Sequence, residues 1–159
     1  MSVTLYRIDD RLIHGQVVES WVPYLKISEI VVVSDDLASD NIRRTIMRFA
    51  TPEGVELKIL KIPEAFEYLN GAPEAQNILV LLPGLKEAAD LLSKGLKIPS
   101  LNIGGMHYCA GKNISIGKAI FLSDEDCSHL KLIAGAGVKL EGRGVPTDKP
   151  IDPLEALLN

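Results

Sequence analysis

Cysteine is scarce in this chain, and long apolar runs are missing. The 159 residues include only Cys109 and Cys127, which form no recognised spacing pattern, so nothing indicates a disulfide framework. No uncharged apolar stretch is long enough to span a bilayer. Residues 1–5 also lack the basic region followed by an apolar one that marks a signal peptide. Together these absences predict a cytoplasmic protein that does not insert into a membrane.

An excess of positive charge is missing as well. The formal net charge is −4 at pH 7, so nothing indicates binding to nucleic acid or to an anionic membrane surface. Hydrophobic residues make up 47% of the chain and charged residues 24%, which is ordinary for a globular protein. A chain of this length supports one domain whose core needs neither disulfides nor metals.

Apolar runs alternate with amphipathic segments, which predicts repeated βα units. Residues 30–33 and 78–82 are continuously apolar, as strands of a parallel sheet are when helices cover both faces. Residues 55–60 alternate between apolar and polar, which favours a strand near an edge. Further strands are expected at residues 3–8, 101–103, 119–122 and 138–141.

Apolar side chains at helical spacing predict helices between these strands. The stripes are Val17, Val18, Trp21, Val22 and Leu25; Ile42, Ile46, Phe49 and Ala50; Leu85, Ala88, Ala89 and Leu92; and Cys127, Leu130 and Ala134. Residues 63–69 predict a shorter helix, and Asp152 before Pro153 predicts the cap of a C-terminal helix at about residues 152–158. The predicted fold is therefore α/β, a single domain over residues 1–159 with a mainly parallel central sheet flanked by helices on both faces.

Ligands of an open α/β sheet bind at the carboxyl ends of its strands, so the residues that follow each strand are the candidates for a site. We expect these loops to meet at one rim of the sheet. They contain Asp9, Asp10, Arg11 and His14; Ser34, Asp35 and Asp36; Pro83 and Gly84; and Gly104, Gly105, Met106 and His107.

His14 lies where the first strand should end and a helix should begin, between Arg11 and Gly15. A helix N-terminus offers free N–H groups to an anion, and Arg11 adds donors suited to phosphate oxygens. Gly15 has no Cβ, so a bound group can approach the backbone closely. Imidazole is a nucleophile at neutral pH, and Asp9 or Asp10 would hold its other ring nitrogen. The pattern predicts a histidine that carries a phosphoryl group.

The same residues also fit structural roles, and both interpretations stay open at this point. Asp10 would then cap the helix, Arg11 would pair with an aspartate, and His14 would fill the first turn. Ser34 and its neighbours either orient Arg11 or cap the next helix. On the second predicted helix, Arg43, Arg44 and Arg48 are expected to form a solvated face.

Two further features of the rim carry weak signals. Gly104 and Gly105 form either a nest of N–H donors for phosphate or a plain turn. His107 lies close to Cys109, but a His-x-Cys pair without matching ligands elsewhere is a poor zinc motif. We therefore expect no metal site and no cofactor, and no glycine pattern of a P-loop or a Rossmann fold is present.

Four blocks of sequence resemble a known family. Residues 7–17 (RIDDRLIHGQV) closely resemble the active loop of the enzyme IIB component of the bacterial phosphoenolpyruvate-dependent sugar phosphotransferase system, in its mannose/fructose/sorbose family. The similarity continues through residues 31–36 (VVVSDD), 102–107 (NIGGMH) and 145–148 (VPTD). It covers nearly the whole chain in the right order and spacing. One departure is Cys109-Ala110, where family members often have a charged or polar residue.

The resemblance implies an α/β fold and transient phosphorylation of His14 through Nδ1. The phosphoryl group would come from a histidine of a IIA partner and pass to a sugar held by the membrane partners IIC and IID. Asp9 and Arg11 would support the phosphoryl group, and backbone donors of residues 11–16 would hold its oxygens. The supporting residues expected around it are Asp10, Leu12, Ile13, Gly15, Gln16, Ser34, Asp36, Gly84 and Gly105.

The sequence leaves alternatives open for the partners of this chain and for its biological role. No IIA domain precedes this sequence, so the donor is expected to be a separate protein, and two copies of the chain would pair through Trp21 or Tyr24 if it is a homodimer. A regulatory phosphocarrier without a sugar permease would use the same chemistry. A phosphate- or nucleotide-binding module without a covalent step would use the same loop, although the chain lacks a nucleotide fingerprint.

Overall fold

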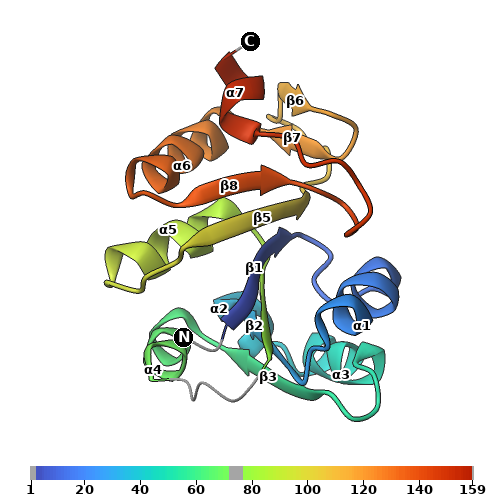
Figure 1. Cartoon of the computed structure of the whole chain (residues 1–159). Helices are drawn as coiled ribbons and strands as arrows, with labels where there is room; N and C mark the ends of the chain where they lie inside the picture. The colour runs from blue at the N-terminus through green and yellow to red at the C-terminus, as the bar shows by residue number, and fades with distance from the viewer. Residues whose placement is uncertain (1–2, 72–76, 159) are drawn as a thin grey trace.

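The computed structural model describes residues 3–71 and 77–158, and its centre is a six-stranded parallel sheet (Figure 1). The strand order is β3-β2-β4-β1-β5-β8, and every neighbouring pair is parallel. The strands are β1 (Val3–Asp9), β2 (Glu29–Val33), β3 (Glu56–Leu60), β4 (Ile78–Leu82), β5 (Ser100–Gly105) and β8 (Lys139–Gly142). The predicted α/β class is confirmed, and so is the edge position of β3.

Helices cover both faces of the sheet. One face carries the helical segment η1 (Val17–Trp21) and α1 (Val22–Leu25), followed by α2 (Asp35–Ala38) and α3 (Asn41–Ala50). The opposite face carries α4 (Ile62–Asn70), α5 (Leu85–Ser93) and α6 (Asp124–Gly135). The C-terminal helix α7 (Pro153–Leu158) packs against α6 and β8. Asp152 caps it by accepting from the N–H groups of Leu154 and Glu155, as its sequence predicts.

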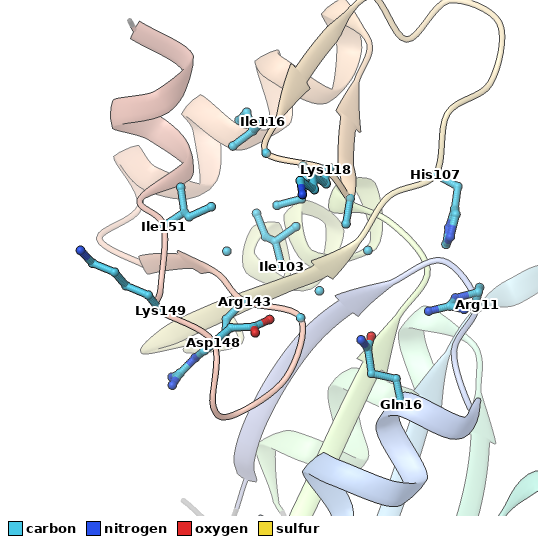
Figure 2. A pocket seen from close by; sticks show the side chains of 17 residues that line it. Arg11, Gln16, Ile103, His107, Ile116, Lys118, Arg143, Asp148, Lys149 and Ile151 are labelled. Carbon is cyan, nitrogen blue, oxygen red and sulfur yellow. The ribbon is translucent and has the colours of Figure 1, made fainter.

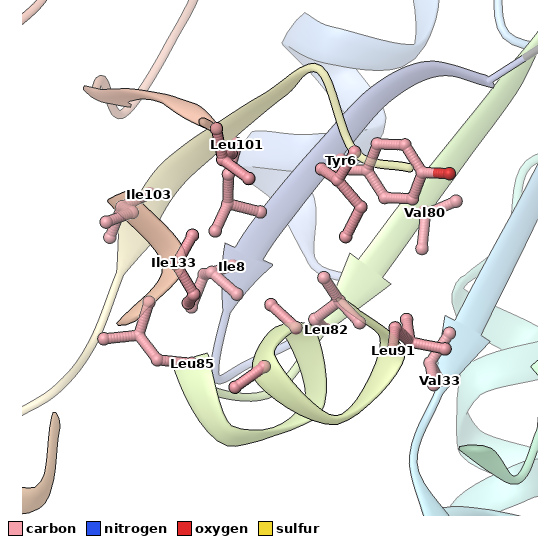
Figure 3. Close-up of a cluster of buried hydrophobic side chains, with 14 of the residues drawn as sticks. Tyr6, Ile8, Val33, Val80, Leu82, Leu85, Leu91, Leu101, Ile103 and Ile133 are labelled. Atoms are coloured by element: carbon pink, nitrogen blue, oxygen red, sulfur yellow. The ribbon is translucent and has the colours of Figure 1, made fainter. Parts of the chain in front are cut away.

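The apolar strands contribute to two cores at once, because successive side chains of a strand point to opposite faces. In β2, Ile30 and Val32 join the core beneath α1, whereas Val31 and Val33 join the core beneath α4 and α5. Figure 3 shows part of this second core, where Val33 lies with side chains from β1, β4, β5 and α5. Continuous apolar runs are therefore needed in the inner strands.

The connection that leaves β1 runs to the opposite face from those that leave its neighbours β4 and β5. The chain passes from β1 to α1 on one face, but from β4 to α5 and from β5 toward α6 on the other. Such a divergence opens a crevice at the carboxyl end of the strands, where ligands of open α/β sheets bind. The loop after β1, which contains His14, lies at this crevice.

Two expectations about the elements are wrong. The segment predicted at residues 119–122 is β7 (Ile120–Leu122), which lies outside the central sheet and pairs antiparallel with an unpredicted strand, β6 (Ile114–Ile116). The strand expected at residues 138–141 is confirmed as β8, which follows α6, pairs with β5 and forms the edge of the sheet.

The predicted inner stripe of α3 is wrong at three of its four positions. Ile42, Ile46 and Phe49 are exposed, and Phe49 keeps 85% of its surface. Ala50 packs against the core as predicted, together with Met47. Because α3 packs near the edge of the sheet, only a narrow strip of its surface contacts the core. Among the described residues, no helix is long and apolar enough to cross a membrane.

Candidate functional site

The chain turns sharply between the end of β1 and His14. Leu12 has a left-handed backbone conformation (φ 60°), and its side chain and that of Ile13 are buried in the core beneath α1. The helical segment begins at Gly15, and the carbonyl of His14 accepts from the N–H groups of Val17 and Val18. The buried side chains of Leu12 and Ile13 fix His14 at the N-terminus of the helix, where the His14 side chain is 14% exposed.

Asp9 holds the imidazole of His14. The Asp9 Oδ2 atom lies 2.7 Å from His14 Nε2, and Asp9 Oδ1 accepts from the backbone N–H of Arg11 at 3.1 Å. Because a carboxylate only accepts, Nε2 is the ring nitrogen that carries the proton. The Nδ1 atom is then left with its lone pair. Of the two aspartates considered from the sequence, the structure places Asp9 in this position.

Asp9 is itself held by a fully buried arginine that the sequence analysis did not select. Arg7 Nη2 donates to Asp9 Oδ2 at 3.1 Å, and its other donors reach Asn102 Oδ1 at 2.6 Å and the carbonyls of Arg143 and Gly144 at 2.9 and 3.0 Å. Burial lowers the pKa of Arg7, and the charge of Asp9 opposes that shift. The pair places a positive charge behind the histidine without exposing it to water.

Two neighbours make room for Arg7 and cover it. Gly104 lies against the guanidinium so closely that a Cβ at this position would overlap Arg7 Cζ. On the other side, the indole of Trp21 has its centroid 5.2 Å from Arg7 Cζ, and its Nε1 donates to the carbonyl of Gly144 at 2.8 Å. Gly104 therefore serves to accommodate Arg7, a role that neither a phosphate nest nor a plain turn describes. Trp21 is 2% exposed, so the expectation that it contacts a second copy is wrong.

The backbone donors of the loop are fewer than expected. The N–H of Arg11 donates to Asp9 Oδ1 and that of Leu12 to the Asp9 carbonyl, because the turn folds back on β1. These two amides are already engaged, and expecting them to bind phosphate is wrong. Within the described part of the chain, the N–H groups of residues 13–16 have no hydrogen-bond partner. They are the free donors of a helix N-terminus.

A cavity of about 460 Å³ lies beside this loop, and we call it the rim cavity. Figure 2 shows Arg11 and Gln16 at one edge of it and Arg143 and Lys149 at the other. The Arg11 side chain is exposed and makes no hydrogen bond or ion pair with other described residues. It does not pair with an aspartate, and its donors remain available. A Cβ on Gly15 would meet only open space, so a bound group can approach this point.

Asp10 does not cap the helix after β1. Its Oδ2 accepts from the backbone N–H of His107 at 2.6 Å, and its Oδ1 lies 2.5 Å from His107 Nδ1. The backbone N–H of Asp10 donates to the carbonyl of Gly105 at 3.1 Å. These bonds tie the loop after β1 to the loop after β5 and bring His107 to the edge of the rim cavity.

Ser34, Asp36 and Gly84 lie apart from the rim cavity. Ser34 and Asp36 line a second cavity of about 490 Å³ between the loops after β2 and β4, and Gly84 precedes α5 beside it. Ser34 caps α2 by accepting from the N–H of Leu37, which supports the capping interpretation. Within the described chain, these three residues make no hydrogen bond or ion pair with Arg11 or His14. In the second cavity, burial raises the pKa of Glu87 to about 7.

Sequence reasoning missed Arg7 and Asn102 as members of the site, and it assigned other roles to Gly104 and Trp21. One signal was present, because Arg7 and Asp9 stand two residues apart on one face of a central strand, where charges are rare. No sequence pattern shows that the carbonyls of Arg143 and Gly144 complete the arginine's environment. Cys109 is exposed, and no group of three ligating side chains gathers in the described residues.

The comparisons with known proteins agree with this geometry. The family model described as "PTS system sorbose subfamily IIB component" matches residues 3–159, where PTS stands for the phosphotransferase system. The sorbose-specific EIIB component of Lacticaseibacillus casei is 38% identical over 156 residues, which cover 97% of this chain and 94% of that protein. The mannose-specific EIIAB component of Escherichia coli K12 is 32% identical over 158 residues, and the match spans 99% of this chain but 49% of that longer protein.

A solved structure gives the same picture. The crystal structure of the IIBSor domain of the sorbose permease from Klebsiella pneumoniae matches with a TM-score of 0.92 and 33% identity. The match covers 99% of this chain and 97% of that one.

Proposed function

The chain belongs to the sorbose subfamily of IIB components, which are phosphotransferases of the sugar phosphotransferase system, and from this membership we propose that His14 carries the phosphoryl group on Nδ1. The observation that carries the proposal is the contact of 2.7 Å between Asp9 Oδ2 and His14 Nε2. Because Asp9 accepts a hydrogen bond from the protonated Nε2, the lone pair of Nδ1 is free to attack phosphorus.

The surroundings of His14 suit a phosphoryl group. The free N–H groups of residues 13–16 and the positive end of the helix stabilise its oxygens. Arg11 adds a planar cation with no competing partner among the described side chains. Transfer between two nitrogens depends mainly on alignment and on stabilisation of charge, and these groups supply both.

The first step moves the phosphoryl group from a histidine of a IIA donor to His14. The phosphorus–nitrogen bond in the donor breaks, its electron pair stays on the donor nitrogen, and a new bond forms to His14 Nδ1. IIB components work between a IIA component and the IIC and IID components. For this chain we propose a IIA protein as donor and a sugar held by IIC and IID as acceptor. We also propose that this transfer takes place in the cytoplasm, as the sequence leads us to expect.

The choice among the alternatives follows from the relatives. Those described above are components of sugar systems, named for sorbose or mannose, which favours sugar transport over a regulatory carrier. A module that binds phosphate without a covalent step has no need of a carboxylate that fixes the tautomer of His14. Pairing of two copies, if it occurs, would use Tyr24, which is 64% exposed, because Trp21 is buried.

The test is reconstitution with phosphoenolpyruvate, the general carriers of the system and a IIA protein of the same family. We expect one acid-labile phosphoryl group per chain, and none in a His14→Ala variant. A His14→Ala protein that still accepts phosphate would overturn the proposal. His129, on α6 outside the rim, offers a control, because His129→Ala should be phosphorylated like the wild type.

A further inference from the structure

His107 forms a second aspartate–histidine pair at the rim, with the opposite ring nitrogen held. Asp10 binds His107 twice, through the backbone N–H at 2.6 Å and through Nδ1 at 2.5 Å. Because the carboxylate accepts, Nδ1 is the protonated nitrogen and Nε2 keeps a lone pair. In the pair of Asp9 and His14 the carboxylate holds Nε2 instead. Two adjacent aspartates thus prepare two imidazoles for different roles.

The second imidazole lies at the edge of the rim cavity, beside the loop that carries His14. His107 lines the rim cavity together with Arg11, and Figure 2 shows its ring directed toward Arg11. A Cβ on Gly105 would lie 3.9 Å from His107 Cε1 and 3.7 Å from Asp9 Oδ1, so the two pairs flank the same glycine. The side chain of His107 is 57% exposed, which leaves Nε2 open to the cavity and to water.

We propose that His107 is the general base of the second half-reaction, in which the phosphoryl group passes from His14 to a hydroxyl of the sugar, and that Asp10 is its positioning residue. The inference rests on the proposed role of His14. The two half-reactions differ in one respect that matters here. Transfer from one nitrogen to another removes no proton, whereas a hydroxyl acceptor must lose one.

The second step balances with the groups present. The bond between phosphorus and His14 Nδ1 breaks, and its electron pair returns to Nδ1, whose ring stays protonated at Nε2 against Asp9. A bond forms between phosphorus and the sugar oxygen, and the hydroxyl proton moves to His107 Nε2. The resulting imidazolium is stabilised by Asp10 and then releases its proton to water through its exposed edge.

The experiment measures the two steps separately in wild type, His107→Gln and Asp10→Asn. The first measurement is the rate at which phospho-IIA labels the protein. The second is the rate at which the isolated phosphoprotein loses its label to membrane vesicles that contain the IIC and IID proteins of a sorbose, fructose or mannose system, with the corresponding sugar as acceptor. His129→Gln is the matched control, because it changes a histidine outside the rim.

We expect His107→Gln to lower the sugar-dependent step by about 100-fold or more, which is the usual contribution of a general base, and to leave labelling within a few fold of wild type. Asp10→Asn should lower the same step, less severely. Normal labelling also reports that each variant is folded. Sugar-dependent discharge at the wild-type rate in His107→Gln would overturn the inference, as would an equal loss in both steps. Failure of the wild-type protein to accept phosphate on His14 would instead overturn the proposed function.

Discussion

Asp9 and His14 are joined by a contact of 2.7 Å between Oδ2 and Nε2, and this contact decides which ring nitrogen reacts. Asp9 is in turn bound by the buried Arg7 and by the backbone N–H of Arg11. A carboxylate held from three sides has little freedom to turn, so the imidazole is fixed in orientation and in tautomer. The reactivity of His14 therefore depends on Asp9 and the buried Arg7 that hold it as much as on the exposed groups that would contact the phosphoryl group.

The close approach of Gly104 to Arg7 gives the first prediction. A Gly104→Ala substitution places a Cβ where the guanidinium lies, and Arg7 is fully buried. Displacing Arg7 leaves Asp9 as a buried charge without its partner, which costs about 3 kcal/mol or more of unfolding free energy. Chemical denaturation measures this loss, and labelling of His14 should slow with it.

Gly135 provides the control for that substitution. It lies at the end of α6, and a Cβ there meets no atom within 4 Å, so Gly135→Ala should be neutral or slightly stabilising. If Gly104→Ala is as stable as Gly135→Ala, the described role of Gly104 is wrong.

Arg11 gives the second prediction. Its side chain is exposed and unpaired among the described residues, so Arg11→Ala should change the unfolding free energy by less than about 0.5 kcal/mol. The phosphoryl oxygens lose a charged donor, however, and the rate of labelling by phospho-IIA should fall roughly 100-fold. Rapid-quench measurement with phospho-IIA gives this rate.

An arginine remote from the rim tests whether charge alone matters. Arg48 is exposed on α3, and Arg48→Ala removes the same charge from the protein without touching the loop. We expect wild-type labelling in this variant. Equal slowing in both variants would mean that overall charge, rather than a contact with the phosphoryl group, explains the effect.

Glu87 gives a prediction about pH. Burial raises its pKa to about 7 in the folded protein from an ordinary value of 4.5, with the neighbouring Asp90 and Asp35 adding to the shift and Lys86 opposing it. The folded state thus binds this proton more tightly than the unfolded state. The contribution of Glu87 to stability therefore falls as the pH rises from about 4.5 to about 7, and it stays at the lower level above that range.

Replacing Glu87 by glutamine removes this titration. We expect Glu87→Gln to be more stable than wild type at pH 8 by on the order of 1 kcal/mol, and the two proteins to converge below pH 4.5. Thermal unfolding at several pH values measures the difference. Glu53→Gln, at an exposed turn, is the matched control. A gain that is the same at pH 4 and pH 8 would contradict the burial of the Glu87 carboxyl.

The sequence predicts the parallel sheet well because burial on both faces leaves a direct signature. Residues 78–82 are apolar at every position, since each side chain enters one of two cores. The α3 stripe fails for the opposite reason. Ile42, Ile46 and Phe49 have helical spacing, but spacing does not say whether a stripe faces the sheet or the solvent. The same limit applies to β7, whose partner β6 is too short to carry a pattern.

The site is predicted in part, and the missing part consists of long-range contacts. His14, Asp9 and Arg11 lie in one short motif, so local reasoning reaches them. Arg7 is bound by carbonyls more than 130 residues away, and such contacts leave no trace in spacing. The expected roles of Ser34 and Asp36 assumed that all loops of the rim converge, but β4 lies between β2 and β1 and keeps them apart.

The central claim concerns one atom, and nuclear magnetic resonance of the phosphorylated protein tests it most directly. With ¹⁵N-labelled histidine, the scalar coupling to phosphorus identifies which ring nitrogen of which histidine is modified. We predict coupling to Nδ1 of His14 and an Nε2 that remains protonated against Asp9. Phosphate on Nε2 of His14, or on His107 or His129, would contradict the account.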